Sequence, residues 1–368
     1  MSRCPGLEFE DIIVEELEPG AVFVEPMQDA SGQLGLKTNR WLKRRGVPVG
    51  DFAFGAKTRS MGQDLDLFFA APAVSSDLLA LSTLHDWRKR SKVAVCYLQE
   101  LWISEFDRQL AGVADILRQF DHVFVGLYHT AEALSRKLGI KVEYMPLGID
   151  AEMWNPYIGT PKPRDIDVCA IGNMDPGTHE ALWNWAEDKG RYYSFTTVGG
   201  ARLSVSHRIH RQNLAQTLKR SKFFFTFMAK RVVTSQRSAQ EEFGPRYYEG
   251  AGAGAIQIGD AVKTNPAYLE HMDWEGAVIE VPYASADMPA LLEDIEKNAD
   301  WLEEVRRRNV ANCLTRHDHL NRWDMVMKAA GFEATPTAEA RRARLQEQAA
   351  NLESPQAVPI NQGRSKGA

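Results

Sequence analysis

Two acidic residues, Glu241 and Glu249, stand on either side of a Phe-Gly-Pro turn in the stretch QEEFGPRYYEGAGAGAIQIGD, and a glycine-rich run follows them. Gly244 and Pro245 predict the start of a helix, because proline at the first helical position loses no hydrogen bond. The free N–H groups of that start would favour a phosphate at residues 243–246. The spacing is typical of a corner that binds phosphate and sugar, although acidic residues also gather near helix starts merely to oppose the dipole.

The residue types in this stretch suggest a division of labour. Arg246 and Glu249 are three positions apart and therefore share one helical face. Arg246 could pair with a phosphate, while Glu249, one turn deeper, could accept hydrogen bonds from ribose hydroxyls. Glu241, before the turn, could reach the hydroxyls of a sugar beyond the phosphate.

The surrounding chain alternates between predicted strands and predicted helices. A helix at 75–90 would begin with a serine cap, and another at 130–139 would be capped by threonine and ended by glycine. This alternation predicts an α/β fold with parallel sheets. Short runs rich in Val, Phe and Tyr predict strands at 21–26, 65–72, 92–98, 122–128 and 141–146, and then at 167–173, 194–200, 222–228, 254–260 and 277–283.

A stretch rich in Pro and Gly, residues 146–165, interrupts the alternation and predicts a linker between two Rossmann-like domains that face each other across a cleft. The predicted organisation is a first domain at 1–148, a linker at 149–165, a second domain at 166–315, a helix crossing back at 316–332, and a polar helix with a flexible tail at 333–368.

Composition excludes several classes of protein. A net charge of −5 argues against a nucleic-acid binder. Cys96 and Cys169 lie in apolar runs and predict buried free thiols. The first 30 residues are acidic, unlike a signal peptide, and no apolar run approaches the length of a membrane span. The expected location is the cytoplasm, with peripheral membrane contact left open.

Two patterns with metal-ligand character are weaker. Asp64-Leu65-Asp66 imitates an Asp-x-Asp metal motif, but it enters a predicted strand where that motif leaves one. His207 and His210 could share a helical face, yet no cysteine or carboxylate set accompanies them. We therefore expect no metal, although His210 could touch a bound donor.

Glu100 and His129 each follow a predicted strand of the first domain, where the binding residues of α/β sheets gather. Either could be a general base, Glu100 could also bind an acceptor, and both could be plain loop residues. No Gly-x-Ser-x-Gly elbow and no P-loop is present, so hydrolase and kinase chemistry find no support.

The opening stretch resembles the Glu-x7-Glu segment of glycosyltransferases with the GT-B fold. Its Arg246-Tyr-Tyr-Glu249 resembles the Arg-x-x-Glu of the spore-maturation-protein-like branch of the group 1 glycosyltransferases. Residues 128–156 resemble the segment that closes the first domain of those enzymes, and RHDHLNRWDMVMKAAGF (316–332) is similar to the terminal helix of the branch. The three matches occur in the order that the family has.

The resemblance implies transfer of a hexose-type sugar from a nucleotide-diphosphate sugar to a hydroxyl of a glycan or small acceptor, as in polysaccharide biosynthesis. The first domain would bind the acceptor and the second the nucleotide sugar. The reaction would be retaining and would need neither metal nor cofactor. The implied catalytic residues are Glu241, Arg246 and Glu100, and the implied donor-binding residues are Gly172, Asn173, His210, Phe243, Gly244, Arg246, Tyr247 and Glu249.

The chain departs from this family at one important place. Relatives carry Arg and Lys after the first strand of the second domain, whereas residues 171–185 here contain neither. Diphosphate contacts would then fall to Arg246, to the 243–246 backbone, or to Arg231 and Arg237. The same departure supports one alternative, a sugar-nucleotide-binding or scaffold protein without turnover. A nucleotide-sugar epimerase is a second alternative, which no feature of the sequence favours.

Overall fold

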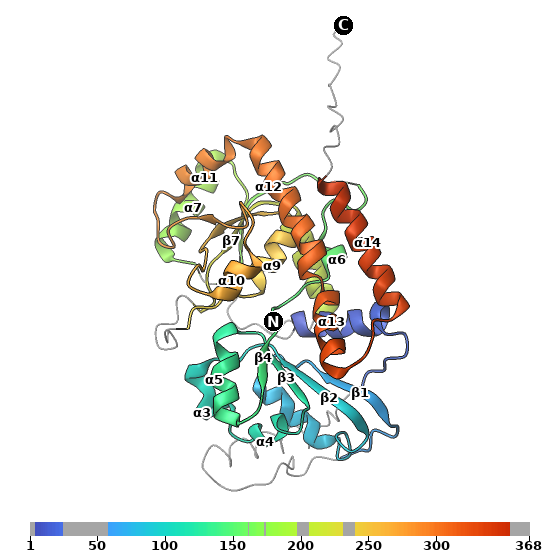
Figure 1. Cartoon of the computed structure of the whole chain (residues 1–368). Coiled ribbons are helices and arrows are strands. Elements are labelled where there is room, and N and C mark those ends of the chain that lie inside the picture. Colours follow the sequence, from blue (N-terminus) through green and yellow to red (C-terminus); the bar gives the residue numbers. More distant parts are fainter. Residues whose placement is uncertain are drawn as a thin grey trace.

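The computed structural model describes residues 4–24, 58–160, 162–172, 174–196, 206–230 and 240–353. Within them the chain forms two parallel β-sheets, one in each half, with helices packed on both (Figure 1). The predicted α/β fold with two Rossmann-like halves is confirmed. No helix in this part of the chain combines the length and the apolar character needed to cross a membrane.

The first sheet has the order β1-β2-β3-β4, and each neighbouring pair is parallel. The strands of this sheet and the helices around it are α1 (Cys4–Ile12), the π-helical turn η1 (Ile13–Leu17), β1 (Leu65–Ala70), the 3-10 helix η2 (Ser75–Thr83), β2 (Ser91–Leu98), η3 (Ile103–Glu105), α3 (Phe106–Gln109), α4 (Ala114–Leu117), β3 (His122–Val125), α5 (Tyr128–Leu138) and β4 (Val142–Tyr144).

The second sheet has the order β6-β5-β7-β8-β9, again all parallel. The order reverses between β5 and β7, and α/β sheets bind ligands outside the carboxyl ends of the strands at such a switch point. The elements are α6 (Ala151–Trp154), β5 (Ile166–Ala170), α7 (Pro176–Lys189), β6 (Tyr193–Phe195), α8 (His207–Lys219), β7 (Ser221–Thr226), α9 (Pro245–Gly252), β8 (Ile256–Gly259), α10 (Pro266–His271), β9 (Ile279–Glu280), α11 (Met288–Glu296) and α12 (Ala299–Asn312).

The end of the described chain returns to the first sheet. After η5 (Cys313–His317), α13 (His319–Ala330) packs Trp323 against Phe69 of β1 and Phe9 of α1. Arg322 donates to the carbonyl oxygens of Pro146 and Leu147, at 3.2 and 3.0 Å from its Nε. The segment between the two sheets is thus held by the same helix that covers the first sheet.

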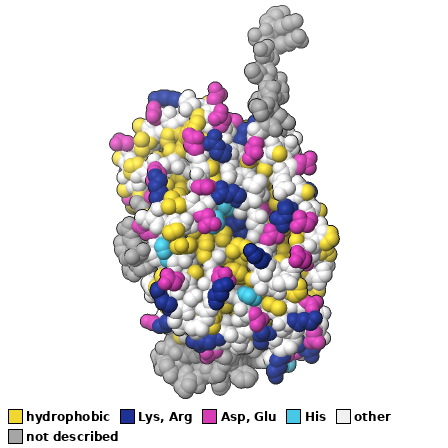
Figure 2. Space-filling model, in the orientation of Figure 1, with side chains coloured by type: hydrophobic (Ala, Val, Ile, Leu, Met, Phe, Trp, Pro, Cys, Tyr) yellow, Lys and Arg dark blue, Asp and Glu magenta, His cyan; other side chains and the backbone are white. Residues whose placement is uncertain are grey.

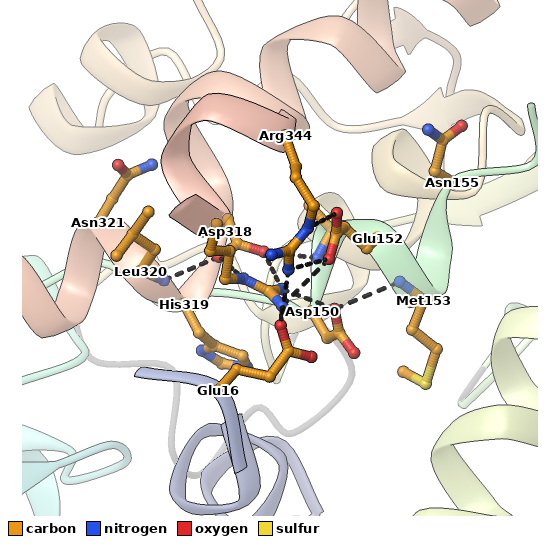
Figure 3. Close-up of polar contacts among 12 residues, drawn as sticks. Glu16, Asp150, Glu152, Met153, Asn155, Asp318, His319, Leu320, Asn321 and Arg344 are labelled. Atoms are coloured by element: carbon orange, nitrogen blue, oxygen red, sulfur yellow. Dashed lines mark hydrogen bonds and ion pairs between the residues drawn. The ribbon is translucent and has the colours of Figure 1, made fainter. Parts of the chain in front are cut away.

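Helix α14 (Pro336–Glu353) contributes one fully buried arginine. Arg341 is 0 % exposed and forms a bidentate pair with Asp318, at 2.9 and 2.7 Å, and a 2.8 Å bond to Asp150. Glu16 and Glu152 complete this acidic cluster (Figure 3). The sequence predicts a merely polar helix here, whereas the helix supplies the cation that joins the N-terminal segment, α6 and α13.

Three local predictions are wrong. The described part of the predicted 21–26 strand, residues 21–24, is irregular, and Phe23 is 50 % exposed. The predicted 75–90 helix is a 3-10 helix that ends at Thr83, and the Ser75 hydroxyl donates to the Gln109 carbonyl instead of capping. Short helices held by tertiary contacts do not follow the periodicity that identifies long ones.

The third error concerns the start of α5. This helix begins at Tyr128, and the predicted cap Thr130 lies inside it, where its hydroxyl donates to the Leu101 carbonyl at 2.7 Å. The predicted stop at Gly139 is confirmed, since this residue takes the left-handed conformation with φ 69°. The cap of α5 comes instead from the second half of the chain, as described below.

Candidate active site

Helix α9 begins as the sequence predicts, with Gly244 at the cap and Pro245 in the first position. Pro245 carries no N–H, and the N–H of Tyr247 donates to the Gly244 carbonyl at 3.3 Å, so an anion at this helix start would be met by the N–H of Arg246. Among the described residues, a Cβ at Gly244 would meet only Ala229, at 4.0 Å, so this backbone is open on their side. The start of α9 is therefore accessible to an anion.

Arg246 lies in this first turn and is held by a buried carboxylate. Its NH1 is 2.5 Å from Oε2 of Glu249, which is 1 % exposed, while the Arg246 side chain is 29 % exposed. The other oxygen of Glu249 accepts from Arg211, a buried residue of α8. Both oxygens of Glu249 accept from guanidinium groups, and at 1 % exposure this carboxylate presents little surface to a ribose.

His210 belongs to the same region of the second domain. Burial lowers its pKa, and the positive charges of Arg211 and Arg246 lower it further. At neutral pH this imidazole is uncharged and can serve as a hydrogen-bond partner. The charges of Arg246 and Glu249 both act on His210, so the three side chains lie in one region of the second domain.

Gly172 marks the carboxyl end of β5, on the switch-point side of the sheet. It is exposed, has φ 108°, and its N–H donates to the Thr196 hydroxyl at 3.0 Å. No described residue lies within 4 Å of the position that a Cβ would take, so this part of the chain leaves the backbone open to a ligand. Asn173, Arg231 and Arg237 lie outside the described residues.

Two predicted donor-binding side chains belong to the core. Phe243 and Tyr247 are 4 % and 0 % exposed and pack edge to face with ring centroids 5.7 Å apart. The Tyr247 hydroxyl donates to the Asp260 carbonyl at 2.9 Å. Both residues can contribute to a donor site through their backbone only.

Glu241 lies beside the loop that follows β8. It is partly buried, and its carboxylate accepts from the Thr264 hydroxyl. Its backbone carbonyl accepts from Nδ2 of Asn265 at 2.9 Å. The carboxylate thus sits at the carboxyl edge of the second sheet.

The next residue, Glu242, joins the two halves of the molecule. It is 2 % exposed, and its oxygens accept from the backbone N–H of Tyr128 at 3.1 Å and of His129 at 3.0 Å. The same oxygens accept from Gln240 at 3.0 Å and Asn265 at 2.9 Å. Glu242 therefore caps α5 from the other domain, which a motif for a local cap cannot reveal.

Lys230 and Gln240 extend this contact between the halves. We call the contact made by Lys230, Gln240 and Glu242 the domain seam. The ammonium of Lys230 lies 4.4 Å from the centroid of the Trp102 ring and 3.6 Å from Oε1 of Glu100. Glu100, one of the predicted bases, also accepts from the Trp102 indole N–H at 2.8 Å. The other predicted base, His129, has its backbone N–H bonded to Glu242.

The sequence gives no signal for Lys230. This residue follows the predicted 222–228 strand, and its positive φ of 55° is a strained conformation that clusters at functional sites. It supplies a cation at the carboxyl end of β7, on the side of the switch point where the expected Arg and Lys of the 171–185 segment are missing. Only the tertiary structure brings it to Glu100.

The metal-like motif has a different role. Asp64 pairs with Arg90 at 2.9 Å and Asp66 with Lys92 at 2.5 Å, at the amino end of β1 and away from the carboxyl edge. Across the described residues, no group of three or more metal-ligating side chains comes together. Figure 2 shows acidic and basic side chains interspersed over one face, in agreement with the small net charge of −5.

A groove of about 1570 Å³ runs between α1 and the edge strand β1. It is bordered by Glu10, Asp11 and His207 but by none of the residues predicted for donor binding. It runs along β1 and past its carboxyl end to Ala73, but because no residue predicted for donor binding lines it, we do not assign the donor to it. Burial raises the pKa of Glu10 to about 7, although the Ala71 N–H bond opposes this shift.

Replacing Glu10 by Gln is expected to stabilise the protein at pH 8 by about 1–2 kcal/mol. This is less than the full pKa shift corresponds to, because the partly exposed side chain is screened by solvent. Burial raises the pKa of Glu10 above its ordinary value of 4.5, so the cost of burying its charge is absent below pH 4.5 and complete above pH 7. Urea unfolding at pH 8 and pH 4 measures this, and the gain must vanish at pH 4. An equal gain at both pH values would show that ionisation of Glu10 is not its cause.

Comparison with known proteins addresses the second half of the chain. Residues 165–328 match the family described as "Glycosyl transferase-like". A solved structure described as a glycosyltransferase from Rickettsia africae ESF-5 is similar, with 12% identity, 84% of each chain covered and a TM-score of 0.39. No curated protein matches the chain. The matched residues hold Glu241, Arg246 and Glu249 but not α1 or the first sheet.

Proposed function

We propose that this protein transfers a sugar from a nucleotide-diphosphate sugar to a hydroxyl of a glycan or small acceptor. The observation that carries the proposal is the open start of α9 with the anchored Arg246 beside it, in the glycosyl transferase-like domain. A backbone N–H at a helix start and a guanidinium are both groups that bind phosphate well. The exposed backbone of Gly172 gives the donor a second point of contact.

In the proposed reaction the bond between the sugar carbon and the diphosphate oxygen breaks, and a bond to the acceptor oxygen forms on the same face. The acceptor proton passes to the departing diphosphate, so no protein nucleophile, metal or cofactor is needed. Arg246 and the start of α9 stabilise the charge that develops on the diphosphate. Glu241 holds the sugar hydroxyls. Glu100 remains the candidate base for an inverting course, because it lies at the domain seam.

Two finer assignments belong to this proposal. The pair Arg246 and Glu249, together with the contact of His317 with Arg322 at 3.2 Å, supports membership of the spore-maturation-protein-like branch. A hexose donor and a role in polysaccharide biosynthesis are carried over with that branch. The cytoplasm is the proposed location, and the four free cysteines, among them the predicted buried thiols Cys96 and Cys169, support a reducing compartment.

Thermal unfolding against a panel of nucleoside diphosphates and nucleotide sugars tests the function. A ligand at 100 times its Kd should stabilise the protein by about 2.7 kcal/mol. Arg246→Ala should weaken binding about 10- to 100-fold, because one charge-assisted hydrogen bond contributes about 1.5–3 kcal/mol. Calorimetric titration of both proteins gives the two Kd values.

Arg191→Ala is the matched control. Its side chain is 30 % exposed and ion-paired like that of Arg246, but its partner Asp167 lies at the amino end of β5. This variant should bind nucleotides as the wild type does. The absence of any stabilisation by millimolar nucleotides would overturn the proposed function. Binding without turnover or donor hydrolysis would favour the non-catalytic alternative, and interconversion of donor sugars would favour an epimerase.

A further inference from the structure

A row of buried charges connects the N-terminal helix to Arg246. Nε of Arg211 lies 2.5 Å from Oε2 of Glu8, NH1 of Arg211 pairs with Glu249, and Glu249 pairs with Arg246. The side chains of Glu8, Arg211 and Glu249 are 6 %, 3 % and 1 % exposed, so of the four only Arg246 reaches the surface to a substantial degree. This row begins in α1, outside the family match, and ends at the proposed donor site.

The inner members of the row are fixed from several sides. Oε1 of Glu8 accepts from the backbone N–H of Asp150 at 2.9 Å and lies 3.2 Å from Nε2 of His319. The guanidinium of Arg211 lies over the Trp154 ring at 4.8 Å. Burial alone would raise the pKa of Glu8, but the attraction of Arg211 and the hydrogen bond from His319 outweigh it and lower this pKa. The two negative and two positive charges of the row therefore balance at neutral pH. The contacts above hold the side chains of Glu8 and Arg211 in one orientation.

Resting on the proposed function, we propose that Glu8 is a positioning residue for the donor diphosphate and acts through Arg211 and Glu249 on Arg246. An arginine in a first helical turn would otherwise sample many rotamers. Here one amino group is bound to a carboxylate that Arg211 itself immobilises, and no second hydrogen bond occupies the Arg246 guanidinium among the described residues. The remaining edge is held ready for an anion, and this order saves entropy on binding.

The same row couples the two halves of the molecule. Phe9, next to Glu8, stacks on His319 at 4.9 Å and packs against Phe69 of β1 at 5.5 Å. Helix α1 therefore lies against the first sheet while its carboxylate enters the second domain. A change in α1 should alter donor binding in a domain to which α1 does not belong in sequence.

Charge-conserving variants separate positioning from net charge. Glu8→Asp keeps the charge but shortens the reach to Arg211, and Arg211→Lys keeps the charge but removes the fork that joins both carboxylates. Each should raise the Kd for the nucleoside diphosphate about tenfold, since small displacements of a binding group cost this much or more. The titrations use UDP, GDP, ADP and TDP in parallel. Where turnover is measurable, the donor KM should rise and the acceptor KM should stay constant.

Asp11→Glu is the matched control, because Asp11 joins the same two helices through His207 and Arg208, both at 2.7 Å, without touching the row. Asp11→Glu should lower the Tm about as much as Glu8→Asp does and should leave the Kd for the nucleoside diphosphate unchanged. Glu8→Gln separates the positioning of Arg246 from the effect of net charge. A higher Kd for the nucleoside diphosphate supports positioning. A lower Kd in Glu8→Gln, together with a Kd in Glu8→Asp equal to that of the wild type, would overturn it. If Arg246→Ala weakens nucleotide binding but Glu8→Asp and Arg211→Lys do not, this inference is wrong and the proposed function still stands. If the wild type binds no nucleotide, the proposed function fails.

Discussion

Replacing Arg341 by Met should lower the free energy of unfolding by about 3–5 kcal/mol, the usual cost of removing one partner from a buried ion pair. Arg341 is 0 % exposed and neutralises the equally buried Asp318 through two hydrogen bonds of 2.9 and 2.7 Å. Without it, Asp318 keeps only backbone donors, Leu320 and Ala151, each at 2.9 Å. Urea unfolding followed by circular dichroism at pH 7 measures the loss.

The pH dependence identifies the cause. Burial alone would raise the pKa of Asp318, but Arg341 lowers it, so in the wild type this carboxylate keeps its stabilising charge until the pH falls below its ordinary value. In the variant, burial without Arg341 should raise the pKa of this carboxyl, so that it takes up a proton at a higher pH than in the wild type. The gap between the two proteins should therefore narrow from pH 7 to pH 5. A gap that stays constant would point to lost packing instead of unpaired charge.

Arg344→Met is the control for this experiment. Arg344 lies on the same helix and contacts the same Glu16 and Glu152, at 2.9 and 3.0 Å, but its side chain is 48 % exposed. Exposed ion pairs contribute about 0–1 kcal/mol, so this variant should unfold almost as the wild type does. A loss as large as that of Arg341→Met would show that burial does not decide the effect.

Replacing Glu242 by Gln, a side chain of the same shape, should destabilise the protein by about 2–4 kcal/mol. Each Glu242 oxygen accepts two hydrogen bonds, from His129 and Gln240 on one side and from Tyr128 and Asn265 on the other. A glutamine must present its NH2 group to one of these pairs of donors, whichever way it is turned. Two buried donors then lose their acceptor, and α5 loses the negative charge at its start.

The neighbouring residue provides the control. The carboxylate of Glu241 accepts from the Thr264 hydroxyl, a contact that a glutamine oxygen can keep. Glu241→Gln should therefore change the free energy of unfolding by less than about 1 kcal/mol. Chemical denaturation of both variants, with hydrogen exchange of the Tyr128 and His129 amides, measures the contrast. Equal stability of Glu242→Gln and wild type, with these amides still protected, would mean that the domain seam does not hold α5.

Local signals in the sequence determined the alternation of strands and helices and the start of α9. Val-rich and Phe-rich runs identify buried parallel strands, and a Gly-Pro pair marks a helix start, because both effects act within a few residues. The same local reasoning placed Gly172 at a strand end and grouped Arg246 with Glu249. It failed at residues 75–90 and at the cap of α5, where distant residues decide the backbone geometry.

The tertiary structure alone decided which charges meet. Glu8 and Arg211 are separated by 203 positions and Arg341 and Glu16 by 325, and no periodicity spans such distances. Lys230 reaches Glu100 only because the two halves of the molecule are in contact. Buried charges must find partners wherever the fold brings them, since desolvation leaves no alternative. The residue types predict a phosphate-binding corner. The packing of α1, α8 and α9 buries Glu249 and leaves Arg246 partly exposed there.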